Sequence, residues 1–135
     1  MGSRREGREM ALQTLYLCDT CSLSFESALK SAFPATLSAQ VQEFASHLAQ
    51  GVLQRKAEID AILTKYAQNW DLHRMATVDR NILRLSTYEI LHDLETPLSV
   101  IIDEAIEIAK TYSTEDSGKF VNGILDKVKT ERKIS

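Results

Sequence analysis

Residues 115–127 read EDSGKFVNGILDK and set out one complete amphipathic helix. Asp116 and Ser117 are good N-cap residues, because their side-chain oxygens can accept hydrogen bonds from the unpaired backbone N–H groups of a first turn. Apolar residues then recur at helical spacing, at Val121, Ile124, Leu125 and Val128. The stretch therefore predicts a capped helix that buries one face.

Phe120 lies beside that apolar stripe rather than within it. At about 100° per residue it shares a line with Gly123 and Lys127. An aromatic ring, a small residue and a cation on one partly exposed face suit stacking on an unpaired base next to a phosphate. Packing of Phe120 against a neighbouring helix is the alternative, and the pattern alone leaves both interpretations open.

The rest of the chain shows the same helical periodicity and no alternating strand pattern. Further helices are predicted over residues 5–18, 24–33, 39–67, 77–93 and 98–112. The third of these divides in two near the polar residues 54–56, Pro34 ends the second, and Pro97 is well placed to open the last. Because the connections are short, the sequence predicts an all-α bundle of seven helices forming one domain over residues 1–135.

Composition places the chain among ordinary globular proteins. Its 135 residues are 44% hydrophobic and 26% charged, enough to bury a core without disulfides or metals. No apolar run approaches the length of about 18 residues that a transmembrane helix needs, and the N-terminus lacks the apolar core of a signal peptide. We therefore expect a cytoplasmic protein without membrane association.

The charge distribution is more informative than the formal net charge of −3, which argues against a general nucleic-acid binder. Arg4, Arg5 and Arg8 lie near the N-terminus, and residues 127–133 hold four more basic side chains. The segment 103–116 has five acidic residues against one lysine. Basic ends allow a local polyanion site on an acidic protein, and solvated chain ends are the alternative.

No catalytic, metal or cofactor site is predicted. Cys18 and Cys21 form a C-x-x-C pair, but a zinc site would need two further ligands, and the three histidines fall into no ligand spacing. We expect two reduced thiols. The sequence also lacks a Gly-rich phosphate loop, a G-x-S-x-G and an H-E-x-x-H motif, so it predicts a protein that is not an enzyme.

Four segments together resemble the NusB family, in the order and spacing of that family. They are residues 4–16 (RREGREMALQTLY), 78–89 (VDRNILRLSTYE), 103–110 (DEAIEIAK) and 116–125 (DSGKFVNGIL). The resemblance covers nearly the whole chain. It implies a fold of seven helices in two packed small bundles and a role in transcription antitermination.

The resemblance also implies partners and site residues. NusB-like proteins bind the boxA element of nascent ribosomal RNA as single-stranded RNA, together with the small-subunit ribosomal protein NusE, and then join other Nus factors on RNA polymerase. From the resemblance and the charge pattern together, the expected RNA-binding residues are Arg4, Arg5, Arg8, Tyr16, Asp116, Lys119, Phe120 and Lys127. The resemblance places Asp79 and Arg80 on a partner-facing surface.

Two other interpretations remain open at this point. One is a helical homodimer that acts only as an interaction module, since some NusB-like proteins dimerise. The other is a NusB-like accessory domain of the kind that precedes a methyltransferase in some ribosomal-RNA-modifying enzymes, although no such catalytic domain is present in this sequence. Glu6 and Glu9 interleave the N-terminal arginines, so we expect weak RNA binding by the isolated chain.

Overall fold

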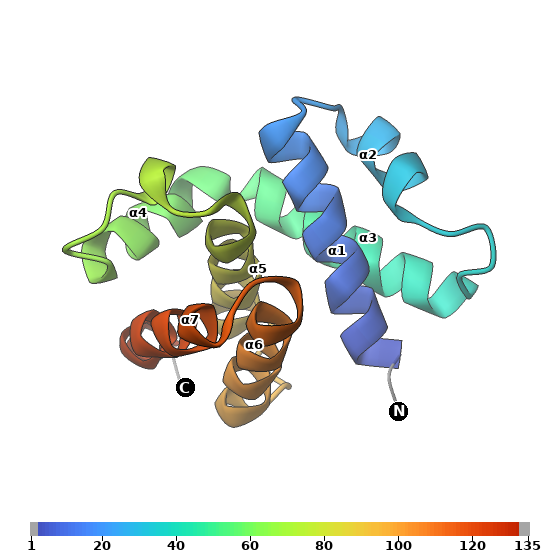
Figure 1. Ribbon diagram of the computed structural model, residues 1–135. Helices are drawn as coiled ribbons and strands as arrows, with labels where there is room; N and C mark the ends of the chain where they lie inside the picture. Colours follow the sequence, from blue (N-terminus) through green and yellow to red (C-terminus); the bar gives the residue numbers. More distant parts are fainter. Residues whose placement is uncertain (1–2, 133–135) are drawn as a thin grey trace.

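The computed structural model describes residues 3–132, and these contain helices and no strand (Figure 1). Its seven α-helices are α1 (Ser3–Thr20), α2 (Phe25–Ala32), α3 (Ala39–Gln54), α4 (Lys56–Tyr66), α5 (Thr77–His92), α6 (Leu98–Tyr112) and α7 (Glu115–Val128). Two short 3₁₀ helices, η1 (Leu72–Arg74) and η2 (Lys129–Glu131), precede α5 and follow α7. The predicted all-α fold is confirmed, including the division of residues 39–67 and the start of α6 directly after Pro97. Lys133 of the predicted basic end lies outside the described residues.

The helices form two small bundles that share α5. Helix α1 packs on α2 and α3, whereas α6 and α7 pack on each other and α4 contacts α7 (Figure 1). Helix α5 contacts α1, α3, α4, α6 and α7, so it belongs to both bundles. The arrangement of two packed bundles expected from the resemblance is therefore present.

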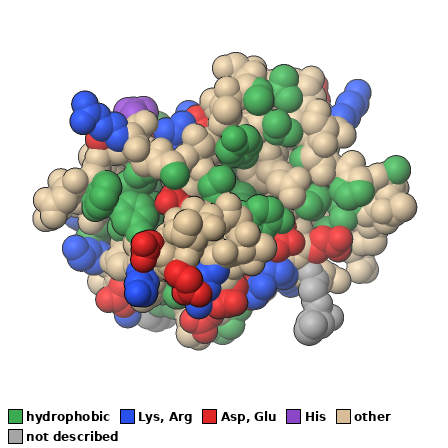
Figure 2. All heavy atoms as spheres, in the orientation of Figure 1, with side chains coloured by type: hydrophobic (Ala, Val, Ile, Leu, Met, Phe, Trp, Pro, Cys, Tyr) green, Lys and Arg blue, Asp and Glu red, His purple; other side chains and the backbone are tan. Residues whose placement is uncertain are grey.

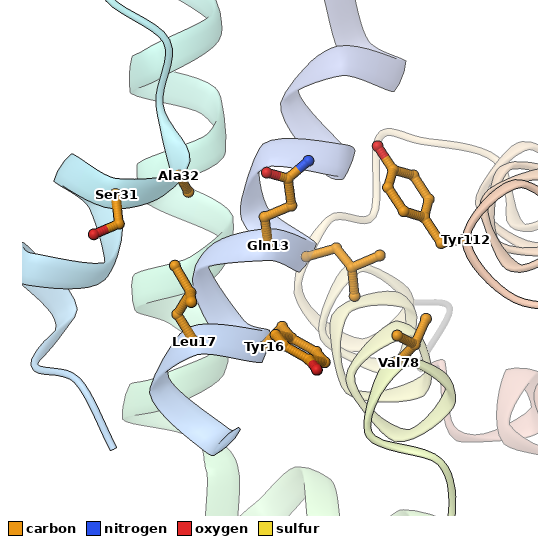
Figure 3. A pocket seen from close by; sticks show the side chains of 8 residues that line it. Gln13, Tyr16, Leu17, Ser31, Ala32, Val78 and Tyr112 are labelled. Atoms are coloured by element: carbon orange, nitrogen blue, oxygen red, sulfur yellow. The ribbon is translucent and has the colours of Figure 1, made fainter. Parts of the chain in front are cut away.

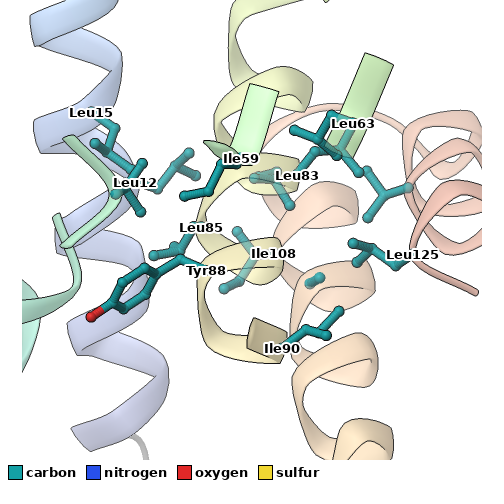
Figure 4. Close-up of a cluster of buried hydrophobic side chains, with 14 of the residues drawn as sticks. Leu12, Leu15, Ile59, Leu63, Leu83, Leu85, Tyr88, Ile90, Ile108 and Leu125 are labelled. Atoms are coloured by element: carbon teal, nitrogen blue, oxygen red, sulfur yellow. The ribbon is translucent and has the colours of Figure 1, made fainter. Parts of the chain in front are cut away.

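Helix α5 is buried on every side along most of its length. All residues from 81 to 90 are buried, in contrast to the single buried stripe of an ordinary surface helix. Figure 4 shows its apolar side chains meeting those of the surrounding helices in one core. The labelled members are Leu83, Leu85, Tyr88 and Ile90 of α5, Leu12 and Leu15 of α1, Ile59 and Leu63 of α4, Ile108 of α6, and Leu125 of α7.

Two glycines let the helices approach closely. A β-carbon at Gly7 of α1 would clash with the ring of Phe44 on α3, and one at Gly51 of α3 would clash with the ring of Tyr88 on α5. Because glycine has no side chain, the aromatic rings can lie directly against the backbone at both crossings. The contacts of α3 with α1 and α5 depend on these two positions.

An ion pair between α1 and α5 is almost completely buried. The guanidinium of Arg8 donates from Nε to Glu89 Oε1 and from Nη2 to Oε2, both at 2.8 Å, and the two side chains are 5% and 1% exposed. Such a two-pronged pair satisfies both charges in the interior. The Arg8 guanidinium, which was expected to contact RNA phosphates, is thus bonded to Glu89 and offers little surface to a ligand in this structure.

The Arg8–Glu89 pair predicts a large stability effect when only one partner is removed. Arg8→Met should lower the free energy of unfolding by about 3–5 kcal/mol, because it leaves the Glu89 carboxylate buried and unpaired. The double variant Arg8→Met/Glu89→Leu should recover most of that loss. Urea unfolding followed by circular dichroism measures both, with Arg4→Met on the exposed part of the same helix as control. Equal stability of the single variant and the wild type would contradict a structural role for the pair.

Candidate nucleic-acid interface

Helix α7 begins one residue before Asp116, and its N-cap is Thr114. The Thr114 hydroxyl accepts a hydrogen bond from the backbone N–H of Ser117 at 3.1 Å, and its backbone is extended, as an N-cap requires. The prediction that Asp116 and Ser117 cap the helix is therefore wrong. Both lie in the first turn, where Asp116 is exposed and Ser117 is buried. The Asp116 carboxylate still has the favourable sign for a helix N-terminus.

Phe120 lies half-buried beside the apolar face of α7 and contacts a second aromatic ring. Its ring centroid is 5.1 Å from that of Trp70, with an angle of 75° between the planes, which is an edge-to-face pair. Trp70 is 58% exposed. Phe120 thus packs on a neighbour and also keeps part of its ring at the surface. Sequence reasoning missed Trp70, although a lone tryptophan in a polar stretch was a signal that could have singled it out.

A cleft opens beside this aromatic pair, between η1 and the first half of α7. Its lining residues are Trp70, Arg74, Met75, Ala76, Asp79, Asp116, Ser117 and Phe120. Asp79, in the first turn of α5, accepts a hydrogen bond on Oδ2 from the Ser117 hydroxyl at 3.2 Å. Its Oδ1 is buried and has no hydrogen-bond partner among residues 3–132. Burial raises the pKa of Asp79, and the neighbouring hydroxyls of Ser117 and Ser113 oppose that rise.

Arg80 ties α5 to the end of α1. Its Nε and Nη2 donate to Asp19 Oδ2 and Oδ1 at 2.7 and 2.8 Å, and its side chain is 14% exposed. Asp19 also accepts hydrogen bonds from Asn81 and Arg84. Asp79 is 8% exposed. Asp79 and Arg80, the two residues expected on a partner-facing surface, are therefore both largely buried.

The N-terminal arginines differ in how free they are to meet a phosphate. Arg4 is exposed, with its guanidinium 4.4 Å from the centre of the Phe44 ring. Arg5 donates from Nε to Glu104 of α6 at 2.7 Å, which neutralises part of its charge. Lys119 and Lys127 of α7 are both exposed. Figure 2 shows acidic and basic side chains interspersed along the lower edge of this face, so a phosphate would meet separate cations there.

Tyr16 lies on the opposite side of the first turn of α5 from Phe120. It is 37% exposed, and its ring lies beside Val78 in an apolar cleft that Tyr112 also lines (Figure 3). Val78 and Asp79 are adjacent in the chain, and each lines one of the two clefts. The structure therefore brings Tyr16 and Phe120, from α1 and α7, to either side of one helical turn.

The described residues form neither a metal-binding cluster nor a membrane-spanning helix. Among residues 3–132, no three side chains of the His, Cys, Asp and Glu types gather to hold a metal ion, and Cys18 and Cys21 are free thiols. No helix in that range is both long and apolar enough to cross a membrane.

Comparison with known proteins identifies the family of this chain. The model of the NusB family matches residues 5–130. The chain belongs to the NusB family. It is 49% identical to the transcription antitermination protein NusB of Elusimicrobium minutum, over 98% of this chain and 97% of the relative. It is 50% identical to that of Desulfitobacterium hafniense, over 93% and 87%.

Solved structures of NusB proteins share the fold. NusB of T. maritima superposes with a TM-score of 0.88 at 40% identity, covering 96% of this chain and 92% of that one. A crystal structure of the antitermination factors NusB and NusE in complex with dsRNA superposes with a TM-score of 0.84 at 26% identity, covering 96% and 98%. The NusB family fold is therefore established for this chain.

The Asp19 cluster predicts a specific loss of stability in acid. Burial raises the pKa of Asp19, but hydrogen bonds from Arg80 and Asn81 and the charges of Arg80 and Arg84 lower it by more, from 3.8 to about 2. Because the folded pKa lies below the unfolded one, this stabilisation of about 2 kcal/mol is present above pH 4 and disappears as the pH falls toward 2.

Unfolding free energies of the wild type and Asp19→Asn, measured between pH 6 and pH 2, test this prediction. The advantage of the wild type should shrink by about 2 kcal/mol across that range. Asp126→Asn is the matched control, because the Asp126 side chain is 65% exposed in its pair with Lys129. A constant difference in unfolding free energy between the wild type and Asp19→Asn would show that Asp19 has the same pKa in the folded and unfolded states.

Proposed function

We propose that this protein is a non-enzymatic transcription antitermination factor that binds boxA-type single-stranded RNA of ribosomal RNA transcripts together with NusE. The observation that carries the proposal is the placement of Tyr16 and Phe120 on either side of the first turn of α5. Both rings are partly exposed, as base stacking requires, and each borders a cleft. The similar structure of NusB and NusE with dsRNA supports an RNA-bound assembly of this kind.

The cations available for phosphates are few, which favours RNA binding that depends on a partner. Arg4, Lys119 and Lys127 are exposed, and Arg5 shares its charge with Glu104. The net charge of −3 adds no general attraction for RNA. In this proposal NusE supplies further contacts, and the pair joins other Nus factors on RNA polymerase in the cytoplasm. Asp79 and Arg80 are largely buried, so they support the partner-facing surface from inside the protein and do not form most of it themselves.

Titration with boxA and scrambled RNA, with and without NusE, tests the proposal. We expect preference for boxA, tighter binding with NusE, and a fall of log K with log salt at a slope of about −2 to −3, from three or four phosphate contacts. Arg4→Ala should flatten that slope by about 0.7 and weaken binding to both RNAs alike. Arg55→Ala is the control, because Arg55 is exposed between α3 and α4.

Two outcomes would contradict this proposal. An unchanged slope in Arg4→Ala would show that Arg4 does not contact an RNA phosphate. A stable dimer in light scattering that binds neither RNA, even with NusE present, would favour the homodimeric interaction module.

Phe120 offers a second test of the same surface. Phe120→Leu keeps an apolar side chain against the core but removes the aromatic face, so RNA affinity should fall by about 1–3 kcal/mol. The free energy of unfolding should change by less than about 1.5 kcal/mol. Phe33→Leu is the matched control, because Phe33 is also half-buried and lies at the end of α2. Equal RNA affinities of the two variants would remove Phe120 from the site.

A further inference from the structure

The cleft beside Phe120 contains three groups to which the proposed function assigns no contact with RNA. They are the exposed ring of Trp70, the guanidinium side chain of Arg74 and the buried carboxylate of Asp79. Hydrophobic side chains gather at the left of the face in Figure 2, between α4 and α7, in the region of this cleft. Each of the three groups matches a different part of one nucleotide.

Trp70 can provide a stacking surface. Trp70 is 58% exposed although its ring forms an edge-to-face pair with Phe120 at 75°, so much of the indole surface is open to a ligand. Tryptophan is the largest aromatic side chain, and every base has a flat face that can stack on it. The ring follows α4 in the loop before η1, where a small outward movement would not disturb a helix.

Asp79 can provide a hydrogen-bond acceptor. The residue is 8% exposed, and its Oδ2 already accepts from Ser117. Its Oδ1 is buried without a hydrogen-bond partner in the described part of the chain, and an unsatisfied buried oxygen costs stability. A ligand N–H that reaches Oδ1 after a small movement of the cleft wall would remove that cost.

The nearby positive groups suit the phosphate of the same nucleotide. Arg74 is exposed at the cleft, and Ala76 at the N-cap of α5 has no side-chain oxygen with which to cap the first N–H groups. Unpaired N–H groups at a helix start favour an anion. Asp116 also lines the cleft, so a phosphate has to lie on the Arg74 side, away from that carboxylate. A basic side chain of a partner is the competing occupant, and the tests below distinguish the two.

The acceptor limits which base fits. Adenine, cytosine and guanine have exocyclic amino groups that can donate to a carboxylate, as cytosine does to acidic side chains. Uracil has no amino group, and its one ring N–H lies between two carbonyl oxygens that a carboxylate would repel. An acceptor at this position therefore suits amino-bearing bases better than uracil.

We propose that the cleft between η1 and α7 binds one unpaired, amino-bearing base of the RNA, with Trp70 stacking on the base, Asp79 accepting from its amino group and Arg74 contacting its phosphate. This assignment rests on the proposed RNA-binding function and adds a base-selective position to it.

The single tryptophan of the sequence makes the first test direct. Addition of boxA RNA should quench the fluorescence of Trp70, with the same midpoint as the binding curve. Trp70→Ala should weaken RNA binding about 5- to 150-fold, and Trp70→Phe should retain most of the affinity. Leu94→Ala is the matched control, because Leu94 is a 57% exposed apolar side chain outside the cleft.

The second test locates the selected base. Each amino-bearing base of the boxA RNA is replaced in turn by uracil, and we expect a 5- to 150-fold loss of wild-type affinity at one position beyond the loss at its neighbours. Asp79→Asn replaces the carboxylate by an amide that can also donate, so it should lose the preference at that position. Thermal unfolding checks that Asp79→Asn is folded, and the scan on the wild type stands without any variant.

The outcomes separate this inference from the proposed function. If boxA binds with the expected salt dependence but Trp70→Ala, Asp79→Asn and the uracil scan show no effect, the base-binding cleft is wrong and the RNA-binding function stands. If Trp70→Ala weakens binding to NusE without RNA and leaves RNA binding intact, the cleft holds a protein side chain, which also overturns the inference. Absence of RNA binding under all conditions overturns both proposals.

Discussion

The burial of α5 on all sides is the constraint on which the rest of the structure depends. A helix in that position cannot leave its polar side chains to water, so its buried charged residues need partners from other helices. Glu89 pairs with Arg8 of α1, and Arg84 pairs with Asp19 of α1 and Asp60 of α4. These directional contacts fix how α1 and α4 lie on α5, a precision that apolar packing alone would not supply.

The same constraint produces the candidate interface. Helix α5 approaches the surface at its two ends, and α1 and α7 flank its first turn with Tyr16 and Phe120. Asp79 lies in this turn. Its Oδ2 accepts a hydrogen bond from Ser117 of α7, and its Oδ1 has no hydrogen-bond partner among residues 3–132. The site is therefore placed where the central helix emerges from its packing, and its aromatic residues come from segments about 100 positions apart.

Several arginines form ion pairs within the protein, and for this reason the candidate interface is only modestly basic. Arg8 and Arg84 are withdrawn into buried pairs, and Arg5 is shared with Glu104. Arg132 donates to the backbone carbonyls of Ile90, Asp93 and Thr96, which satisfies the end of α5 rather than a ligand. Of the basic residues grouped at the two chain ends in the sequence, Arg8 and Arg132 thus act within the protein, Arg5 is shared with Glu104, and Arg4 stays exposed.

The sequence by itself determined the helices, because helical periodicity, prolines and short connections act between residues within a few turns of one another. It placed α6 at Leu98–Tyr112 and put Phe120 outside the apolar stripe of α7. Only the tertiary structure decided that Arg8 is buried, since its partner lies 81 positions away. It also decided the Trp70–Phe120 pair, because a contact between segments 50 positions apart is set when the helices pack and not by local pattern. The Thr114 cap is a contact between residues three apart, and the sequence left it undecided because Thr114, Asp116 and Ser117 are all suitable N-cap residues.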